Sequence, residues 1–163
     1  MLGKLISKEE CARCRLCCSF DSYDLWETPV IPPRLASMIL QDYKPDQEFL
    51  RLEDHFLLKM KKEPDRDLYY CSLLDHEKGC IMGDNKPFDC RIWPLRLMEL
   101  GGVRVIVLSP VCPTVQTRPL NEIQAVAREL ADEIFRYGDE NPVAVKKYID
   151  GYPIMVVEKP KQA

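Results

Sequence analysis

The chain has 163 residues, 46% of them hydrophobic, and its 23 basic and 26 acidic residues leave a net charge of −3. This length predicts a single domain over residues 1–163 with enough apolar content for a buried core. The near balance of charge argues against nucleic acid as a partner, because phosphate binding needs a basic excess. No apolar run could cross a bilayer and residues 1–10 lack a signal-peptide core, so we expect no membrane partner and a cytoplasmic location.

Eight cysteines carry most of the chemistry in this sequence. Four stand in the spacing C-x2-C-x2-C-C near the amino terminus and four follow singly: Cys11, Cys14, Cys17, Cys18, Cys71, Cys80, Cys90 and Cys112. In a reducing compartment, disulfides explain such a set poorly, and unliganded buried thiols do not explain the clustering. The pattern therefore indicates a cysteine-ligated metal site, in which some thiols could instead be structural or redox-active.

The amino-terminal cysteines are predicted to lie on one helix. Ser7 and Glu10 have the spacing of a capping box, which predicts a helix from about residue 8 to about 19. At about 100° per residue, Cys11, Cys14 and Cys18 share one face of that helix and Cys17 lies at its edge. Residues 20–33, rich in aromatic side chains and proline, are predicted to be irregular, and they could form an apolar wall beside the metal site or, equally well, a packed loop.

The middle of the chain is predicted to present the next cysteines from strands and turns. We expect a helix over 33–42, a short helix over 47–52, strands over 55–61 and 68–74, and turns over 62–67, 75–79 and 83–87. In this arrangement Cys71 comes from a strand, and Cys80 and Cys90 each follow a turn.

The last third contains the clearest periodic patterns. Residues 95–100 and 103–108 form a predicted hairpin across Gly101-Gly102, after which Cys112 follows. An apolar 3–4 spacing predicts a helix over 119–137 that Gly138 ends, followed by a short helix to about residue 150 and a strand over 152–158. The predicted fold is α+β: a small antiparallel sheet around the hairpin, flanked by the cysteine helix and the 119–137 helix, with a cysteine-rich metal-binding core.

Sites made only of thiolates select zinc, copper(I) or iron–sulfur clusters. Two features favour iron–sulfur. The C-x2-C-x2-C run has the spacing with which ferredoxins hold three corners of a cluster. No glycine follows Cys14 or Cys17, where a zinc knuckle usually needs one. We therefore expect an iron–sulfur cluster, most simply [4Fe–4S], with all eight cysteines as candidate ligands for one or two sites and zinc as the alternative.

Other candidate residues are weaker. His55 and His76 could be ligands, but isolated histidines are more often surface or turn residues. Lys86 and Arg91 flank Cys90 and could supply positive charge to a cluster or to an anionic substrate, although a solvated loop charge explains Lys86 equally well. The sequence has no phosphate-binding glycine loop and no Ser/His/Asp arrangement.

Two blocks of the sequence carry a family resemblance. They are Cys11 to Cys18, and Gly79-Cys80 through Lys86-Pro87-Phe88-Asp89-Cys90-Arg91-Ile92-Trp93-Pro94, with Cys71 ahead of the second. They resemble the CxxCxxCC family of zinc- or iron-chelating proteins, which includes small uncharacterised proteins described as iron–sulfur oxidoreductases and a larger relative, flagellin lysine-N-methylase. The second block is similar to that family's G-C … R-P-x-x-C-R-x-x-P signature, with Lys86 in place of the usual arginine and Met82 where tyrosine is frequent. The resemblance implies metal chelation by these cysteines.

The expected function is therefore that of a cytosolic iron–sulfur protein. It would transfer electrons to a protein or small-molecule redox partner, or support a modification reaction. Two alternatives stay open. One is a zinc-stapled structural or interaction module, whose metal serves only to fold the chain. The other is a methylase-like enzyme component, so the sequence does not decide whether the protein is an enzyme.

Overall fold

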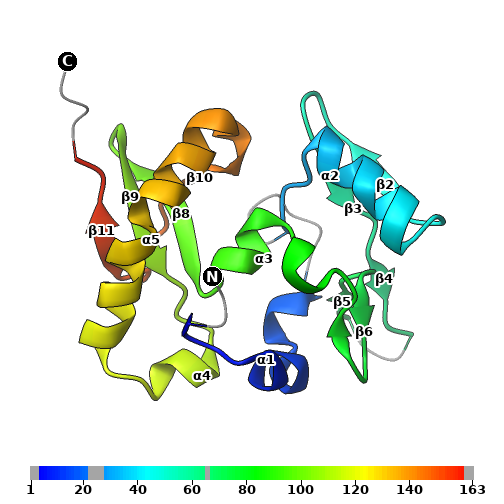
Figure 1. Cartoon of the computed structure of the whole chain (residues 1–163), viewed down its shortest axis with the longest axis horizontal. Helices are drawn as coiled ribbons and strands as arrows, with labels where there is room; N and C mark the ends of the chain where they lie inside the picture. Colours follow the sequence, from blue (N-terminus) through cyan, green and yellow to red (C-terminus); the bar gives the residue numbers. More distant parts are fainter. Residues whose placement is uncertain (1–3, 22–27, 65–66, 160–163) are drawn as a thin grey trace. The chain divides into compact units, whose positions relative to one another are not determined.

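The computed structural model describes residues 4–21, 28–64 and 67–159. By their contacts the residues divide into two compact units: unit 1 is Met1–Ile6 with Ile92–Ala163, and unit 2 is Ser7–Arg91 (Figure 1). The single domain expected from length stays a prediction, and each unit is described here by itself. Part of the irregular segment predicted over 20–33 lies outside the described residues.

Unit 1 is built on the predicted hairpin, which is confirmed. Strands β8 (Leu95–Leu100) and β9 (Val103–Leu108) pair antiparallel, and Gly101 and Gly102 form the turn with φ of 60° and 83°. β11 (Ile154–Val157) pairs antiparallel with β9, and β10 (Lys146–Lys147) pairs parallel with β8. The strand order of this sheet is β10-β8-β9-β11, so β11 stands at one edge.

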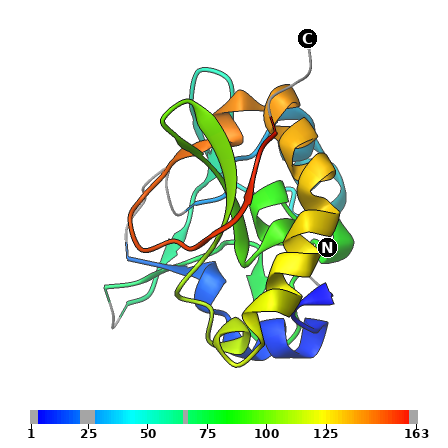
Figure 2. The same cartoon turned by 90° about the vertical axis from the view of Figure 1, so that its left-hand side faces the viewer.

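Helix α5 (Leu120–Glu140) packs along one face of this sheet (Figure 2). Its apolar spacing produces a buried stripe that includes Ile123, Ala127 and Ile134. Burying a side chain such as Ile134 contributes about 1.5–3 kcal/mol, so this stripe holds the helix on the sheet. The unit also contains the short helix α4 (Pro113–Gln116) and the 3-10 turn η5 (Pro142–Ala144). The helix predicted from 141 to 150 is wrong beyond η5, because β10 pairs with β8 there.

Gly138 does not end α5, contrary to the sequence prediction. The helix continues to Glu140, and Gly138 is buried inside it. A Cβ at this position would lie 2.6 Å from Leu97 Cδ2 and 3.0 Å from Arg104 Nη1. Glycine is therefore required because helix and sheet approach closely here, and not because the chain turns.

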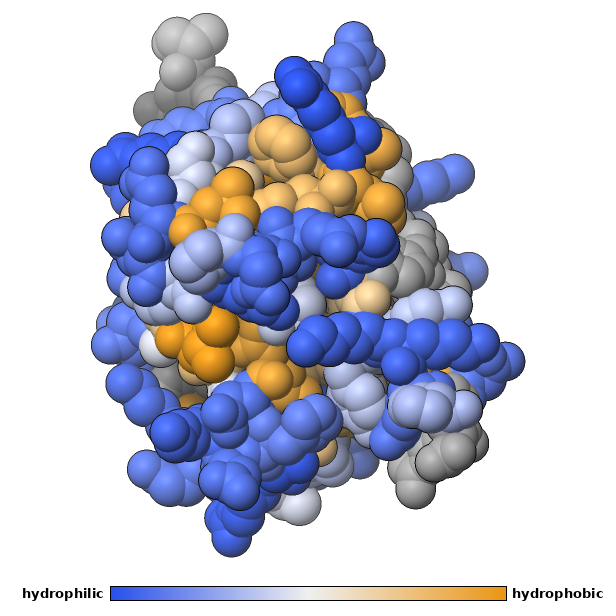
Figure 3. Space-filling model, turned by 90° about the vertical axis from the view of Figure 1, so that its right-hand side faces the viewer, coloured by the Kyte–Doolittle hydropathy of each residue, from blue (hydrophilic) through white to orange (hydrophobic). Residues whose placement is uncertain are grey.

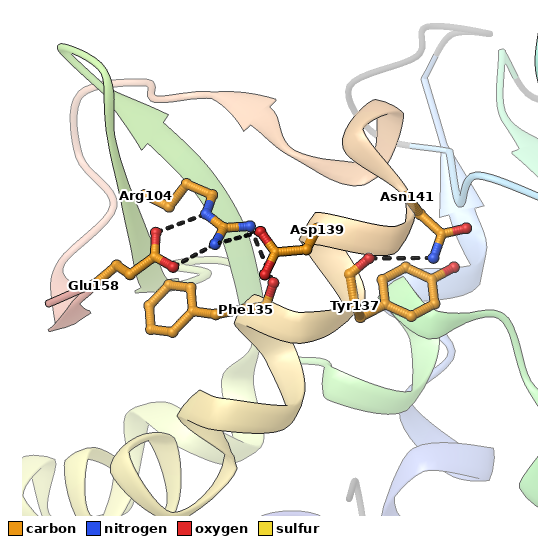
Figure 4. Close-up of polar contacts among 6 residues, drawn as sticks. All are labelled: Arg104, Phe135, Tyr137, Asp139, Asn141 and Glu158. Atoms are coloured by element: carbon orange, nitrogen blue, oxygen red, sulfur yellow. Dashed lines mark hydrogen bonds and ion pairs between the residues drawn. The ribbon is translucent and has the colours of Figure 1, made fainter. Parts of the chain in front are cut away.

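One arginine links three elements of unit 1 (Figure 4). Arg104 of β9 donates from Nε to Glu158 Oε2 at 2.7 Å and forms a second bond with the same carboxylate just beyond β11. Its guanidinium also lies 3.0 Å from Asp139 and donates to the Phe135 carbonyl of α5. The paired carboxylates raise the pKa of this side chain, which keeps the arginine charged.

Unit 2 consists of short elements. Its helices are α1 (Lys8–Cys14), the 3-10 turn η2 (Leu16–Cys18), α2 (Pro33–Met38), the π-helical turn η3 (Ile39–Tyr43), the 3-10 turn η4 (Gly83–Asn85) and α3 (Phe88–Ile92), whose last residue belongs to unit 1. Its strands are β1 (Ser19–Phe20), β2 (Phe49–Arg51), β3 (Phe56–Leu58), β4 (Lys61–Lys62), β5 (Tyr69–Tyr70), β6 (Leu74–Asp75) and β7 (Gly79–Cys80).

Unit 2 contains three small antiparallel sheets, β1-β5-β4, β2-β3 and β6-β7, and one apolar cluster to which β2-β3 and β6-β7 contribute. Ile31, Ile39 and Leu58 are fully buried in it, and Cys71 and Cys80 pack against it. The short helix predicted over 47–52 is wrong: residues 49–51 pair with 56–58 as a strand, so tertiary pairing overrides the ambiguous local pattern.

Apolar side chains also reach the surface. In Figure 3 they gather in separate orange patches bordered by hydrophilic residues, and the exposed large apolar residues of unit 2 include Leu40, Leu50 and Ile81. Isolated exposures of this kind are ordinary in soluble domains. The described residues contain no helix that is both long and apolar enough to traverse a bilayer. Helices mixed with small, largely antiparallel sheets place the chain in the α+β class.

We expect Gly138→Ala to destabilise unit 1 by about 1–3 kcal/mol, because the new methyl group must displace Leu97 or Arg104. Glu133→Ala, at an exposed position of the same helix, is the matched control and should change stability by less than about 0.5 kcal/mol. Urea unfolding followed by the helical circular-dichroism signal measures both. Equal midpoints for the two variants would contradict the close helix–sheet contact.

Candidate functional site

The capping box predicted at the start of the cysteine run is confirmed. Ser7 Oγ accepts from the Glu10 N–H at 3.1 Å, and Glu10 Oε2 accepts from the Ser7 N–H at 2.8 Å. This reciprocal pair satisfies two helix-end donors and fixes α1 to begin at Lys8. The Cys11 N–H then bonds to the Ser7 carbonyl at 3.0 Å, which holds the first cysteine in the first turns of the helix.

The helix does not extend to residue 19, so the single helical face predicted for Cys11, Cys14 and Cys18 is wrong. It stops at Cys14, and Arg15 adopts the left-handed conformation with φ of 55°. The Arg15 Nε donates to the Ala12 carbonyl at 2.9 Å, and its own carbonyl accepts from Ser19 Oγ at 3.1 Å. After this reversal η2 carries Cys17 and Cys18.

The reversal makes Cys17 the centre of the run. Cys17 is hydrogen-bonded to both Cys11 and Cys18. The bond to Cys17, burial and the neighbouring Cys17 charge raise the pKa of Cys11. The bond from Cys11 lowers the pKa of Cys17, but the bond to Cys18, burial and the charges of Cys18 and Cys14 outweigh it and raise that pKa. Cys14 is exposed at the helix end.

A backbone hydrogen bond joins this run to Cys71. The Cys71 N–H donates to the Cys18 carbonyl at 2.9 Å, extending the antiparallel pairing of Ser19 with Tyr70. Burial, together with the charges of Cys80 and Cys17, raises the pKa of Cys71 to about 12. The Leu73 N–H, two residues on, donates to the Cys71 sulfur and opposes this shift.

The β6–β7 hairpin presents Cys80 beside α1. Asp75 Oδ1 accepts from the N–H groups of Glu77 and Lys78, both at 2.8 Å, and closes the turn. Gly79 follows with φ of 86°, and a Cβ there would lie 3.1 Å from Ala12 Cβ. Burial raises the pKa of Cys80, while the Met82 N–H donates to its sulfur and lowers that pKa.

Cys90 comes from α3. Its N–H bonds to the Pro87 carbonyl at 3.0 Å, and the preceding Asp89 accepts from the Val30 N–H at 3.1 Å, which holds this helix to the rest of unit 2. Burial raises the pKa of Cys90 well above its ordinary value, and the charges of Cys71, Cys17 and Cys80 act in the same direction.

Seven of the predicted ligands therefore act on one another, and they come from distant stretches of unit 2. They are Cys11, Cys14, Cys17, Cys18, Cys71, Cys80 and Cys90. Cys14 stands at the margin of this group, because it acts on Cys17 but is itself exposed. Cys112 is buried in unit 1 at the start of α4, so its place in a shared site stays a prediction.

The weaker candidates take different positions. The His76 ring packs edge to face on Tyr70 with centroids 5.3 Å apart, and His55 Nδ1 pairs with Asp54 at 2.6 Å. The positive charge of Lys86 lowers the pKa values of Cys11 and Cys80, as expected of a cation beside this group. Arg91 lies over the Phe88 ring, 5.9 Å from its centroid.

The donor set has the chemistry of a soft-metal site. All eight cysteines are free thiols, and the cysteines of unit 2 except Cys14 are partly buried. Over residues 4–21, 28–64 and 67–159, however, no three His, Cys, Asp or Glu side chains already stand at the spacing that would hold a metal ion. The type of donors fits a thiolate site, and the side chains would have to close around the metal.

Comparison with known proteins adds no relative: no family model, curated protein or solved structure matches this chain. Two features of the site escaped sequence reasoning. The left-handed Arg15 has no local signal, because arginine is not a residue type that favours positive φ. The N–H···S bonds at Cys71 and Cys80 depend on the turn after each cysteine, and the sequence did not resolve those turns.

We expect Gly79→Ala to loosen the hairpin that carries Cys80, because the new methyl group would press on Ala12 and the positive φ costs about 1–2 kcal/mol. Gly83→Ala is the control, since Gly83 also has a positive φ, 55°, but no atom lies within 4 Å of its Cβ position. Hydrogen exchange of residues 74–82 measures the effect. Equal protection in the two variants would show that contact with α1 does not position this hairpin.

Proposed function

We propose that this protein is a cysteine-ligated metal protein that binds an iron–sulfur cluster, most simply [4Fe–4S]. One observation carries the proposal: thiols from the cysteine run, from β5 to β7 and from α3 lie close enough for each to disfavour ionisation of its neighbours. Several thiolates gathered in a buried place repel one another. A bound cation removes that repulsion and turns it into binding energy.

The backbone supports the same proposal. The N–H groups of Leu73 and Met82 point at the sulfurs of Cys71 and Cys80, two residues before them. Hydrogen bonds of this kind favour the thiolate over the thiol and tune the potential of iron–sulfur clusters. The residues that would hold the metal are Cys11, Cys17, Cys18, Cys71, Cys80 and Cys90, with Cys14 and Cys112 as further candidates.

The role that follows is electron transfer with a protein or small-molecule partner, in the cytoplasm, or support of a modification reaction. Partly buried sulfurs suit electron transfer, because burial limits water around a cluster and so sets its potential. Resemblance to the CxxCxxCC family supports metal chelation, and its methylase relative is the source of the modification role. Neither nucleic acid nor membrane enters this proposal.

A specific observation favours zinc as the second candidate. The absence of glycine after Cys14 argued against a tight zinc knuckle, but Arg15 adopts the left-handed conformation that a glycine would supply. That sequence argument therefore loses its force. The preference for iron–sulfur then rests on the C-x2-C-x2-C spacing, and a zinc-stapled module explains the same thiols.

Protein purified without oxygen should be brown and should contain iron together with acid-labile sulfide, because a cluster bound by thiolates carries both. Metal analysis and sulfide determination on the same sample test this directly. A colourless protein with stoichiometric zinc and no sulfide would overturn the iron–sulfur proposal in favour of the zinc module. A protein that binds neither metal, also after reconstitution, would overturn both.

Cys17→Ser should lower metal content far more than Cys14→Ser. The Cys17 thiol bonds to two other thiols, whereas Cys14 is exposed at the end of α1. The two substitutions are chemically identical and stand three residues apart, so Cys14→Ser is a matched control. Metal per chain, measured with circular dichroism to verify folding, decides the comparison. Equal losses would mean that Cys17 has no central position.

A further inference from the structure

A groove in unit 1 runs between α5 and β11. It has a volume of about 710 Å³, and its lining includes Ala131 and Phe135 of the helix and Met155 of the strand. These three side chains are buried, so they give the groove an apolar floor. Helix and strand run side by side in the views of Figures 1 and 2, and residues of both line the groove.

The strand that borders the groove is an edge. In the described part of the chain β11 has β9 as its only strand neighbour. Edge strands present backbone N–H and C=O groups that can pair with another chain. Gln124 Nε2 donates to the Met155 carbonyl at 3.3 Å, which covers the edge where β11 begins. Farther along, Val157 is 54% exposed.

The carboxylates and the cations that line the groove differ in whether they already have an ion-pair partner. Two of its three carboxylates, Asp139 and Glu158, are bound by Arg104 (Figure 4). The cations Arg128, Arg136 and Lys159, in contrast, form no ion pair with any described residue. Beside them Asp132 is the one lining carboxylate that Arg104 does not bind. The accessible rim is therefore cationic on a chain whose net charge is −3.

The spacing of these cations matches an extended chain. Arg128 and Arg136 are eight residues apart on α5, so their backbones are separated by about 12 Å along the helix axis. Residues i and i+4 of a β-strand are separated by about 13 Å and point to the same face. Acidic side chains at these two positions would reach the two arginines, and residue i+2 between them would face Ala131 and Phe135.

We propose that this groove binds an acidic, extended peptide segment of a partner protein, which adds as a strand to the free edge of β11 with carboxylates at positions i and i+4 on Arg128 and Arg136. Backbone pairing with β11 supplies affinity, and the two arginines with the apolar floor supply specificity. A second copy of this chain fits less well, because two-fold pairing of β11 would bring two cationic rims together. The proposal is independent of the metal centre.

Nuclear magnetic resonance titration of the 163-residue chain as purified tests it. The probe is the blocked peptide Glu-Thr-Val-Thr-Glu, whose carboxylates have the required spacing, added to about 1 mM in low salt to limit screening. We expect saturable shifts confined to residues 128–139 and 154–159. In the double variant Arg128→Glu, Arg136→Glu affinity should fall by about tenfold or more.

Matched controls test whether a loss of peptide affinity comes from the changed charge and not from a disturbed fold. Arg34→Glu, an exposed arginine of α2 in unit 2, should leave peptide affinity unchanged. Lys-Thr-Val-Thr-Lys should not bind the unmodified chain, and should gain affinity for the double variant. Absence of shifts with the acidic peptide, equal binding of both peptides, or shifts that follow protein concentration through self-association would each overturn the proposal.

Discussion

The backbone hydrogen bond from Cys71 to the Cys18 carbonyl is the interaction on which the arrangement of unit 2 depends. It continues the pairing of β1 with β5 and so fixes the end of the cysteine run against a strand that is fifty residues away in the chain. Because Cys71 and Cys80 also pack on the apolar cluster of unit 2, this one pairing brings the run to the buried thiols. The contact of Gly79 with Ala12 of α1 acts in the same direction, because it holds the hairpin that carries Cys80 against the run.

That arrangement has an electrostatic cost. Burial disfavours each thiolate, and each additional thiolate disfavours the next, so the pKa values of Cys11, Cys71 and Cys90 are raised. Lys86 and two N–H···S bonds act in the opposite direction but do not cancel the effect. A buried group of polar atoms in this condition is stable as neutral thiols or with a cation. The second of these two states is the one on which the proposed metal binding rests.

Unit 1 is stabilised by other means. A 21-residue helix covers one face of the four-stranded sheet, and Arg104 ties the strand β9 to the helix and to the chain after β11. The side chain of Arg104 is only 15% exposed, so its ion pairs are less screened than those at the surface. Because Arg104 binds Asp139 and Glu158, these two carboxylates are not available to the cations beside them, which form no ion pair with any described residue.

Sequence alone determined the features that depend on local pattern. The capping box at Ser7 and Glu10, the Gly101-Gly102 hairpin, the apolar stripe of α5, the α+β class and the identity of the candidate thiol ligands all follow from residue type and spacing. Tertiary structure decided the rest. Helical periodicity placed Cys17 at the edge of a face, but the left-handed Arg15 makes it the centre, and Gly138, which resembles a helix end, is required by Leu97 at 2.6 Å. Spacing reports which side chains share a face. It does not report which distant neighbour meets that face, because contacts between residues far apart in the chain leave no local period.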